Sequence, residues 1–315
     1  MGLFELAGLP RFSVTPIAIM AVDFQHAYTH LPNGLQLHYV AAGNGPLILF
    51  VHGFPEFWYE WKEQLADFGR DHLAVAPDMR GCNLSAKPAL VKDYRAKHLV
   101  EDLRLLAAHL GSTRFVLVAH DWGGAVAWSL AAVHPELIEK LVVINAPHPA
   151  IFARELRGNP AQQQASAYMN LFRSDKAERV LSENGYARLA RMTLDEWAAN
   201  GGAATDADRS AYLAAWSEPG ALTGGLNYYR ASPLHPPEAG SLSALPDMDP
   251  DMFHVRVPTL VIWGERDAAL LTGNLDGLED HVDDLRVVRI PEASHWVVHE
   301  QPARINALIR GFIGR

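Results

Sequence analysis

Short apolar runs alternate with longer helix-period segments in this chain, and this alternation constrains the fold more than any other feature. The apolar runs lie between residues 36 and 147 and again between residues 256 and 296. Helical periodicity is found near residues 56–69, 98–110 and 123–134. Because the runs lack a polar alternation, we expect strands buried on both faces, as in a sheet covered by helices. The expected fold class is α/β, with a mostly parallel sheet and helices on both faces.

A long helical segment interrupts this pattern. The strand signal stops after residue 147 and resumes at residue 256, and the stretch between is rich in Ala, Gln, Arg and Trp. Such an insert implies a helical cap over the carboxyl edge of the sheet, where open α/β sheets bind ligands. We therefore expect an N-terminal extension (1–23), a first core segment (24–147), a helical cap (148–245) and a second core segment (246–315).

Composition excludes several classes of protein. The net charge of −9 argues against a nucleic-acid partner, because no basic stripe is present to displace counterions from phosphates. No run approaches the ~20 consecutive apolar residues of a membrane-spanning helix. The single cysteine, Cys82, cannot form an internal disulfide, so a reducing compartment, the cytoplasm, is expected. His, Cys and carboxylate residues show no metal-ligand spacing, and no cofactor is expected.

The stretch VAHDWGGAVAW, residues 118–128, places an aspartate at the turn between a predicted strand and a predicted helix. Desolvating a carboxylate costs several kcal/mol unless it is hydrogen-bonded or used. A small-x-nucleophile-x-small turn holds its central side chain out on a strained corner, and residues 119, 123 and 124 are small. Asp121 is therefore a candidate nucleophile. The simpler alternative is that it caps the helix.

Two further residues complete a catalytic pattern. Asp267 in WGERD comes just after one late predicted strand, and His295 in EASHW comes just after the next. A nucleophile, then an acid, then a histidine, each at the carboxyl end of a strand, is the order of a hydrolase triad.

On these residues the chain resembles an α/β-hydrolase of the epoxide hydrolase and haloalkane dehalogenase group, from about residue 24 onward. The motifs that carry the resemblance are HGFPEFWYEW (52–61), DMRGCNLSAKP (78–88), HDWGG and ASHW. The resemblance implies the α/β-hydrolase fold with a helical cap inserted after strand 6, and an aspartate nucleophile. Cys82 stands where the family usually has an aromatic residue, and we interpret it as a packing residue.

The same resemblance implies an oxyanion hole and a pocket. In such enzymes the main-chain N–H groups of the residue after His-Gly and of the residue after the nucleophile form the oxyanion hole, here those of Phe54 and Trp122. The Phe54–Pro55 bond resembles the family's cis peptide. Further motif residues are expected around an apolar substrate pocket: His52, Pro55, Trp58 and Trp296.

An aspartate at this corner changes the reaction. It displaces a leaving group from saturated carbon and becomes an ester, which water activated by a histidine then hydrolyses. An epoxide leaves as an alkoxide and needs an acid. The resemblance places two cap tyrosines in that role, Tyr168 in SAYMNLFRSD and Tyr229 in GGLNYYRAS, with Tyr228 as the competitor of Tyr229.

The sequence therefore predicts an epoxide hydrolase, an ether-bond hydrolase that adds water to an oxirane to give a vicinal diol. Its expected partners are a small apolar epoxide and water. One alternative is a haloalkane dehalogenase that holds the halide through the indole N–H of Trp122. Another is a non-catalytic ligand-binding member of the fold. The sequence leaves the oligomeric state open between a monomer and a homodimer.

Overall fold

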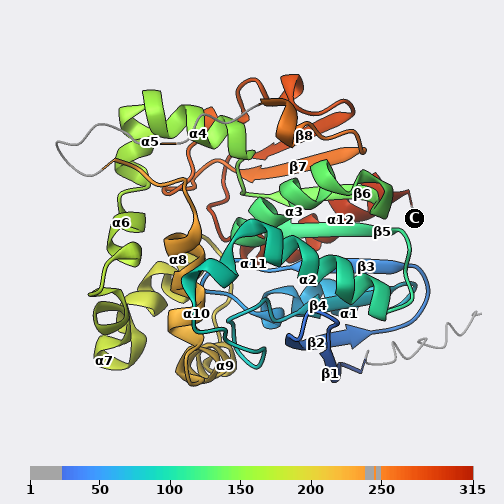
Figure 1. The fold of residues 1–315 in the computed structure, drawn as a ribbon, viewed down its shortest axis with the longest axis horizontal. Coiled ribbons are helices and arrows are strands. Elements are labelled where there is room, and N and C mark those ends of the chain that lie inside the picture. The colour runs from blue at the N-terminus through green and yellow to red at the C-terminus, as the bar shows by residue number, and fades with distance from the viewer. Residues whose placement is uncertain (1–22, 238–244, 246–249, 315) are drawn as a thin grey trace, which may run out of the picture.

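An eight-stranded sheet forms the centre of the computed structural model, which describes residues 23–237, 245 and 250–314. The strand order is β1-β2-β4-β3-β5-β6-β7-β8 (Figure 1). The pairs β1–β2 and β2–β4 are antiparallel, and all the others are parallel. The strands are β1 (Gln25–His30), β2 (Gln36–Ala42), β3 (Leu47–Val51), β4 (Leu73–Pro77), β5 (Phe115–His120), β6 (Ile138–Ile144), β7 (Thr259–Gly264) and β8 (Leu285–Ile290).

Helices cover both faces of this sheet, as the apolar strand pattern predicts. Helices α2 and α3 pack together over one face, and α1 and α12 pack together over the other (Figure 1). The core helices are α1 (Lys62–Phe68), α2 (Ala96–His109), α3 (Asp121–Val133), α11 (Val297–Glu300) and α12 (Pro302–Ile313). The inserted helices are α4 (Pro149–Gly158), α5 (Pro160–Ala165), α6 (Tyr168–Arg173), α7 (Ala177–Met192), α8 (Leu194–Ala199), α9 (Asp206–Ser217) and α10 (Ala221–Ala231).

The central strands match the expected burial, whereas the edge strands do not. Every residue of β3, β5 and β7 is buried, because these strands have neighbours on both sides and helices on both faces. Strand β8 is an edge strand and exposes much of its length, including both of its arginines. Strand β1, at the other edge, was missed by the sequence analysis because its residues, QHAYTH, are mostly polar and mostly exposed.

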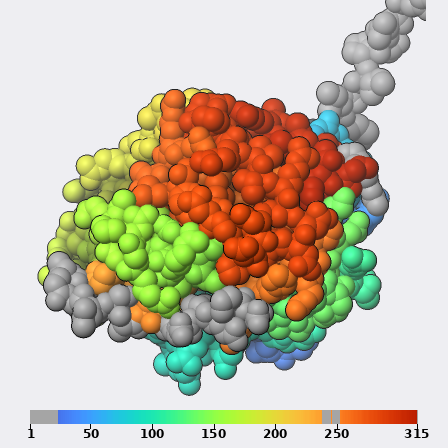
Figure 2. Space-filling model, turned by 90° about the horizontal axis from the view of Figure 1, so that it is seen from above, coloured from blue at the N-terminus to red at the C-terminus, as the bar shows by residue number. Residues whose placement is uncertain are grey.

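The helices α4–α10 lie between β6 and β7, which confirms an insertion after strand 6. These two strands are direct neighbours in the sheet, with Leu141 opposite Thr259. Figure 2 shows α4 and α5 at the surface directly beside the orange-to-red C-terminal part of the chain. Arg154 of α4 crosses this boundary and donates to the main-chain carbonyl groups of Gly273 and Asp276 (3.0 and 2.8 Å).

The expected N-terminal extension lies outside the described residues, apart from residue 23, and so does part of the expected boundary between cap and second core segment. Within the described part of the chain, no helix combines the length and the apolar character needed to cross a membrane.

Candidate active site

Asp121 occupies a strained corner between β5 and α3. Its φ is +49°, a left-handed conformation that is uncommon for residues other than glycine. His120 holds the N-cap position without a side-chain cap hydrogen bond, so Asp121 is not the helix cap. The corner also requires glycines nearby, because a Cβ on Gly123 would lie 2.2 Å from the carbonyl oxygen of Val51. Strain of about 1–3 kcal/mol persists where the surrounding structure imposes it, and often where function uses it.

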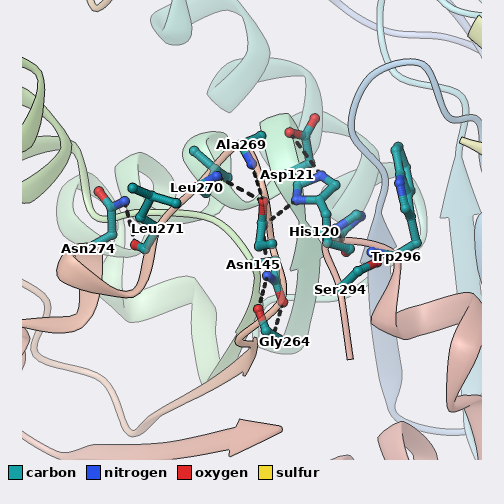
Figure 3. Close-up of polar contacts among 12 residues, drawn as sticks. His120, Asp121, Asn145, Gly264, Ala269, Leu270, Leu271, Asn274, Ser294 and Trp296 are labelled. Carbon is teal, nitrogen blue, oxygen red and sulfur yellow. Dashed lines mark hydrogen bonds and ion pairs between the residues drawn. The ribbon is translucent and has the colours of Figure 1, made fainter. Parts of the chain in front are cut away.

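The three residues of the predicted triad lie together. His295 Nδ1 lies 2.7 Å from Asp267 Oδ2, and its Nε2 lies 3.6 Å from Asp121 Oδ2. The second oxygen of Asp267 accepts hydrogen bonds from the main-chain N–H groups of Ala269 (2.8 Å) and Leu270 (2.9 Å) (Figure 3). Both oxygens of Asp267 are thus hydrogen-bonded, and the carboxylate is fixed in place. It orients the His295 ring so that Nδ1 donates to Asp267 and Nε2 faces Asp121.

Asn145 is a further member of this arrangement, and the sequence analysis missed it. It follows β6 with a φ of +38°, and its Nδ2 donates to Asp267 Oδ2 over 2.8 Å (Figure 3). Its Oδ1 accepts from the N–H group of Gly264 over 2.8 Å. Asn145 thus ties the triad acid to the ends of β6 and β7. The signal that could have revealed it is its position at the carboxyl end of a central strand.

The charges of the triad stabilise one another. Burial opposes ionisation of Asp121, but His295 and the N–H group of Phe54 hold the pKa of Asp121 below its usual range. Burial alone would lower the pKa of His295, but Asp267 and Asp121 raise that pKa well above its usual value. In the free enzyme, Asp121 is therefore an ionised carboxylate beside a protonated imidazole.

The loop after β3 supplies the first predicted oxyanion donor. The main-chain N–H group of Phe54 donates to Asp121 Oδ1 over 2.8 Å, and the Phe54–Pro55 peptide bond is cis. Helix α10 backs this loop closely, because a Cβ on Gly225 would lie 2.6 Å from the Phe54 ring. Trp122 follows Asp121 in the first turn of α3, and its ring packs edge-on against Tyr229 with centroids 5.0 Å apart.

A cavity of about 280 Å³ opens above Asp121. A second, smaller cavity of about 80 Å³ shares Asp121 and the two predicted tyrosines with it. The larger cavity is mostly apolar, and the predicted residues among its lining are Phe54, Pro55, Asp121, Tyr168, Tyr229, Asp267, His295 and Trp296. The geometry therefore brings most of the predicted site residues to one space.

Two residues expected at the substrate pocket lie elsewhere. His52 is fully buried below the loop, where its Nε2 accepts from the N–H group of Met79 over 2.8 Å. Trp58 packs against the rings of Phe24 and His26, on the side toward β1 and β2. Neither residue is among the lining of the two cavities at Asp121, so the structure does not bring them together with the other predicted pocket residues. Their motif turns away from the cavity after Pro55, which sequence spacing alone does not show.

The two predicted tyrosines come from different cap helices and meet at the cavity. Tyr168 begins α6 and Tyr229 lies in α10, and their ring centroids are 6.2 Å apart. Burial and the nearby Asp121 carboxylate raise the pKa of both phenols, so both keep their protons at neutral pH. Tyr228, the competitor of Tyr229, instead donates its hydroxyl group to the main-chain carbonyl of Arg80.

Cys82 lies apart from the triad as a buried thiol, and burial followed by the charge of Asp78 raises its pKa to about 12. A protonated thiol of this kind fits a packing residue. Among the described residues, no group of three or more His, Cys, Asp or Glu side chains could hold a metal ion.

Comparisons with known proteins identify the family of this chain. The family model described as the alpha/beta hydrolase fold matches residues 46–302. The chain is 40% identical over 288 residues to the AB hydrolase superfamily protein YfhM of Bacillus subtilis, covering 89% of this chain and 95% of that protein. It is 36% identical over 298 residues to human epoxide hydrolase 4, covering 91% of this chain and 78% of that protein.

Solved structures place the chain in the same group. A crystal structure of a Bacillus megaterium epoxide hydrolase in complex with an inhibitor superimposes with a TM-score of 0.84 at 36% identity, covering 92% of this chain and all of that one. An epoxide hydrolase from metagenomes of hot environments gives a TM-score of 0.83 at 38% identity, with 92% and 99% covered. The chain belongs to the alpha/beta hydrolase fold family, in its epoxide hydrolase branch.

Proposed function

We propose that this protein hydrolyses epoxides to vicinal diols through a covalent ester on Asp121. The observation that carries the proposal is that one cavity is lined both by a strained, ionised aspartate and by two protonated tyrosines. The relatives named as epoxide hydrolases support the substrate class. One related structure, of a mutant Bacillus megaterium epoxide hydrolase, holds its product, a naphthyloxy-propanediol.

In the first step, a carboxylate oxygen of Asp121 attacks a ring carbon of the epoxide, and the C–O bond of that carbon breaks. Oδ1 accepts from the Phe54 N–H group, so Oδ2 is the oxygen that is free to attack. The departing oxygen would be a strongly basic alkoxide, and Tyr168 and Tyr229 donate hydrogen bonds to it as it leaves. One of the two phenols transfers its proton to that oxygen and then takes a proton from solvent water. Acid assistance of this kind contributes typically 10² to 10⁴ in rate.

In the second step, water attacks the ester carbonyl carbon while His295 takes a proton from that water. The new oxyanion forms at Oδ1, which accepts from the N–H group of Phe54. The N–H group of Trp122 is its proposed second donor. The tetrahedral intermediate then collapses with cleavage of the Cγ–Oδ2 bond. The diol leaves with Oδ2 and the proton of the new carboxyl group, which restores the Asp121 carboxylate and the protonated His295.

Ester formation has removed the negative charge of Asp121, which raised the pKa of His295 in the free enzyme. The imidazole therefore loses its proton more easily at the stage where it must act as a base.

The two tyrosines favour an epoxide over a haloalkane as the substrate. A halide leaves without a proton, so a dehalogenase has no use for phenols at this position. The intact triad argues against a non-catalytic ligand-binding protein. No metal or organic cofactor takes part in the proposed chemistry.

Four further assignments belong to this proposal. The core comprises residues 24–147 and 246–315, the cap comprises residues 148–245, and residues 1–23 precede the core as an extension. The substrate is a small apolar epoxide, in keeping with the mostly apolar lining of the cavity. The acidic net charge supports a partner other than nucleic acid, and the single cysteine supports a location in the cytoplasm.

The test compares styrene oxide and a 1-haloalkane as substrates for the wild type, Asp121→Asn and the Tyr168→Phe/Tyr229→Phe double variant. We expect diol from the wild type and a large loss of diol formation in both variants. Halide release that survives the tyrosine substitutions would instead assign the protein to the dehalogenase reaction. Wild-type protein that is folded but turns over neither compound would favour the ligand-binding alternative.

A further inference from the structure

A buried glutamate and histidine lie directly beneath the triad. Glu60, between β3 and α1, is 1% exposed, and His120, the residue before Asp121, is 0% exposed. Glu60 Oε1 lies 2.6 Å from His120 Nδ1. On its other side, His120 Nε2 lies 2.9 Å from the main-chain carbonyl oxygen of His295. The pair therefore connects the loop after β3 to the segment that carries the triad histidine.

The hydrogen-bond partner of His120 indicates where the protons of the Glu60–His120 pair lie. A carbonyl oxygen only accepts, so His120 Nε2 must carry a hydrogen toward His295. Burial and the charge of His295 lower the pKa of His120 to about 4, which makes its ring neutral. A neutral imidazole has one N–H, so Nδ1 bears a lone pair. The remaining proton of the short contact must then belong to Glu60.

The contacts of Glu60 also differ from those of a salt bridge between an ionised carboxylate and a protonated imidazole. Despite its 2.6 Å length, the contact between Glu60 Oε1 and His120 Nδ1 is not a hydrogen bond donated by the ring, and Glu60 Oε2 has no hydrogen-bond partner within the described chain. An ionised carboxylate in this position would leave negative charge buried without donors, which is costly.

The surroundings of Glu60 also oppose its ionisation. Burial raises the pKa of Glu60 well above its usual value, and the charges of Glu56 and Asp121 add to this effect. His299 and His295 act in the opposite direction but do not reverse it. Unlike Glu60 Oε2, both oxygens of Glu56 have partners, the hydroxyl group of Tyr212 and the His299 ring.

We propose that Glu60 is a positioning residue which, as a neutral carboxylic acid, holds His120 in the tautomer that donates to the His295 carbonyl. Glu60 touches neither the substrate cavity nor a reacting atom. It acts through His120 on the backbone that carries the triad imidazole, and so on the hydrolysis of the ester. This role rests on the function proposed above.

Two substitutions distinguish a protonated Glu60 from an ionised Glu60. Glu60→Gln keeps the shape and can donate to His120 Nδ1 through its amide, so it should retain kcat within about threefold of the wild type. Glu60→Leu removes the donor and frees His120 to take the other tautomer. We expect kcat to fall about tenfold or more, while kcat/KM changes little and the Asp121 ester accumulates. Glu155→Gln, a buried acid of α4 that pairs with Arg154, is the control.

A spectroscopic measurement decides the protonation state without any substrate. The infrared difference spectrum between the wild type and Glu60→Gln should contain the C=O stretching band of a protonated carboxylic acid, absent from the matching spectrum of Glu155→Gln. Thermal unfolding of each variant checks that the fold is retained.

The outcomes are distinct. Absence of the protonated-acid band, or equal loss of kcat in Glu60→Gln and Glu60→Leu, would mean an ionised glutamate and overturn the proposal. Wild-type kcat in both variants would show that the pair does not position His295. If the wild type turns over no epoxide, the function itself fails and the positioning role fails with it, while the infrared band still reports whether Glu60 carries a proton.

Discussion

Tyr228 donates its hydroxyl group to the main-chain carbonyl of Arg80 over 2.8 Å, whereas its neighbour Tyr229 lines the cavity above the nucleophile. Successive helical residues point about 100° apart, so the two phenols cannot serve the same site. The hydroxyl group of Tyr229 is therefore the one available to the substrate.

We expect single Tyr168→Phe and Tyr229→Phe substitutions each to lower kcat/KM for an epoxide, by about 10²-fold, because each removes an acid from ring opening. Tyr228→Phe is the matched control, since its hydroxyl group is directed at Arg80. It should leave kcat/KM nearly unchanged and lower stability by about 1 kcal/mol. Steady-state kinetics on all three variants check this. A larger kinetic effect at Tyr228 than at Tyr229 would reverse the assignment.

Replacing His295 by Gln should trap the ester. Ring opening uses Asp121 and the tyrosines, whereas ester hydrolysis needs the base, so the first step continues and the second stops. Intact-protein mass spectrometry after incubation with styrene oxide should show an increase equal to the mass of one substrate molecule. Adding Asp121→Asn to the same variant should abolish that increase. Labelling that persists in the double variant would place the nucleophile elsewhere.

The ionisation of His295 should depend on the charge of Asp121. Both Asp267 and Asp121 raise the pKa of His295 in the free enzyme, so Asp121→Asn, which imitates the neutral ester, should lower that pKa. An NMR titration of the His295 ring, assigned with His295→Gln, measures the shift. An unchanged pKa would contradict the proposed switch from imidazolium to base.

The same shift affects stability. The folded-state pKa of His295 lies above the ordinary value of about 6.5, so its stabilising contribution is complete below that pH and disappears as the pH rises through the folded-state pKa. Urea unfolding at a series of alkaline pH values should show the wild type losing more of its unfolding free energy than His295→Gln does.

Asp102 should be important for stability. It forms a two-bond pair with Arg80 (both 2.7 Å), and the two side chains are 2% and 8% exposed. Asp102→Ala leaves the arginine charge buried and unpaired, so we expect a loss of about 3–5 kcal/mol in unfolding free energy. The neighbouring pair Glu101–Arg104 is 39% and 36% exposed, and Glu101→Ala should cost about 0–1 kcal/mol. Urea denaturation compares the two variants.

Gly53→Ala should impair the nucleophile directly. A Cβ at this position would lie 2.2 Å from Asp121 Oδ1, so the aspartate must move away from the N–H group of Phe54. Both half-reactions should slow. Gly311→Ala, in α12 with open space around it, is the control and should gain about 0.5–1 kcal/mol in stability. Normal activity in Gly53→Ala would argue against the oxyanion role of Phe54.

Much of the fold could be predicted because the central strands are buried on both faces and therefore leave a continuous apolar signal. The corner at Asp121 could also be predicted, since small residues surround an acid between a strand and a helix. Strand β1 could not, because an exposed edge strand needs no apolar face. The packing of Trp58 against Phe24 likewise depends on how β1 folds back on β2, which no local pattern encodes.

The polar contacts around the site were the least predictable part. Asn145 is informative only when its distance to Asp267 is known, and Glu60 only when its contact with His120 is known. Both contacts join residues far apart in the sequence. The choice between neighbouring tyrosines likewise depends on the rotation of α10, which brings the hydroxyl group of Tyr228 to Arg80 in the loop after β4.

The insertion of the cap between two adjacent strands has an evolutionary consequence. Asp121, Asp267 and His295 all lie outside the inserted segment, whereas Tyr168 and Tyr229 lie within it. The residues proposed for ester hydrolysis and those proposed to donate to the leaving oxygen thus lie on separate stretches of chain. Because β6 and β7 are already neighbours, the insert can diverge in length and sequence without disturbing the sheet. Changes in the insert can therefore alter which epoxides are accepted, while the residues proposed for ester hydrolysis stay unchanged.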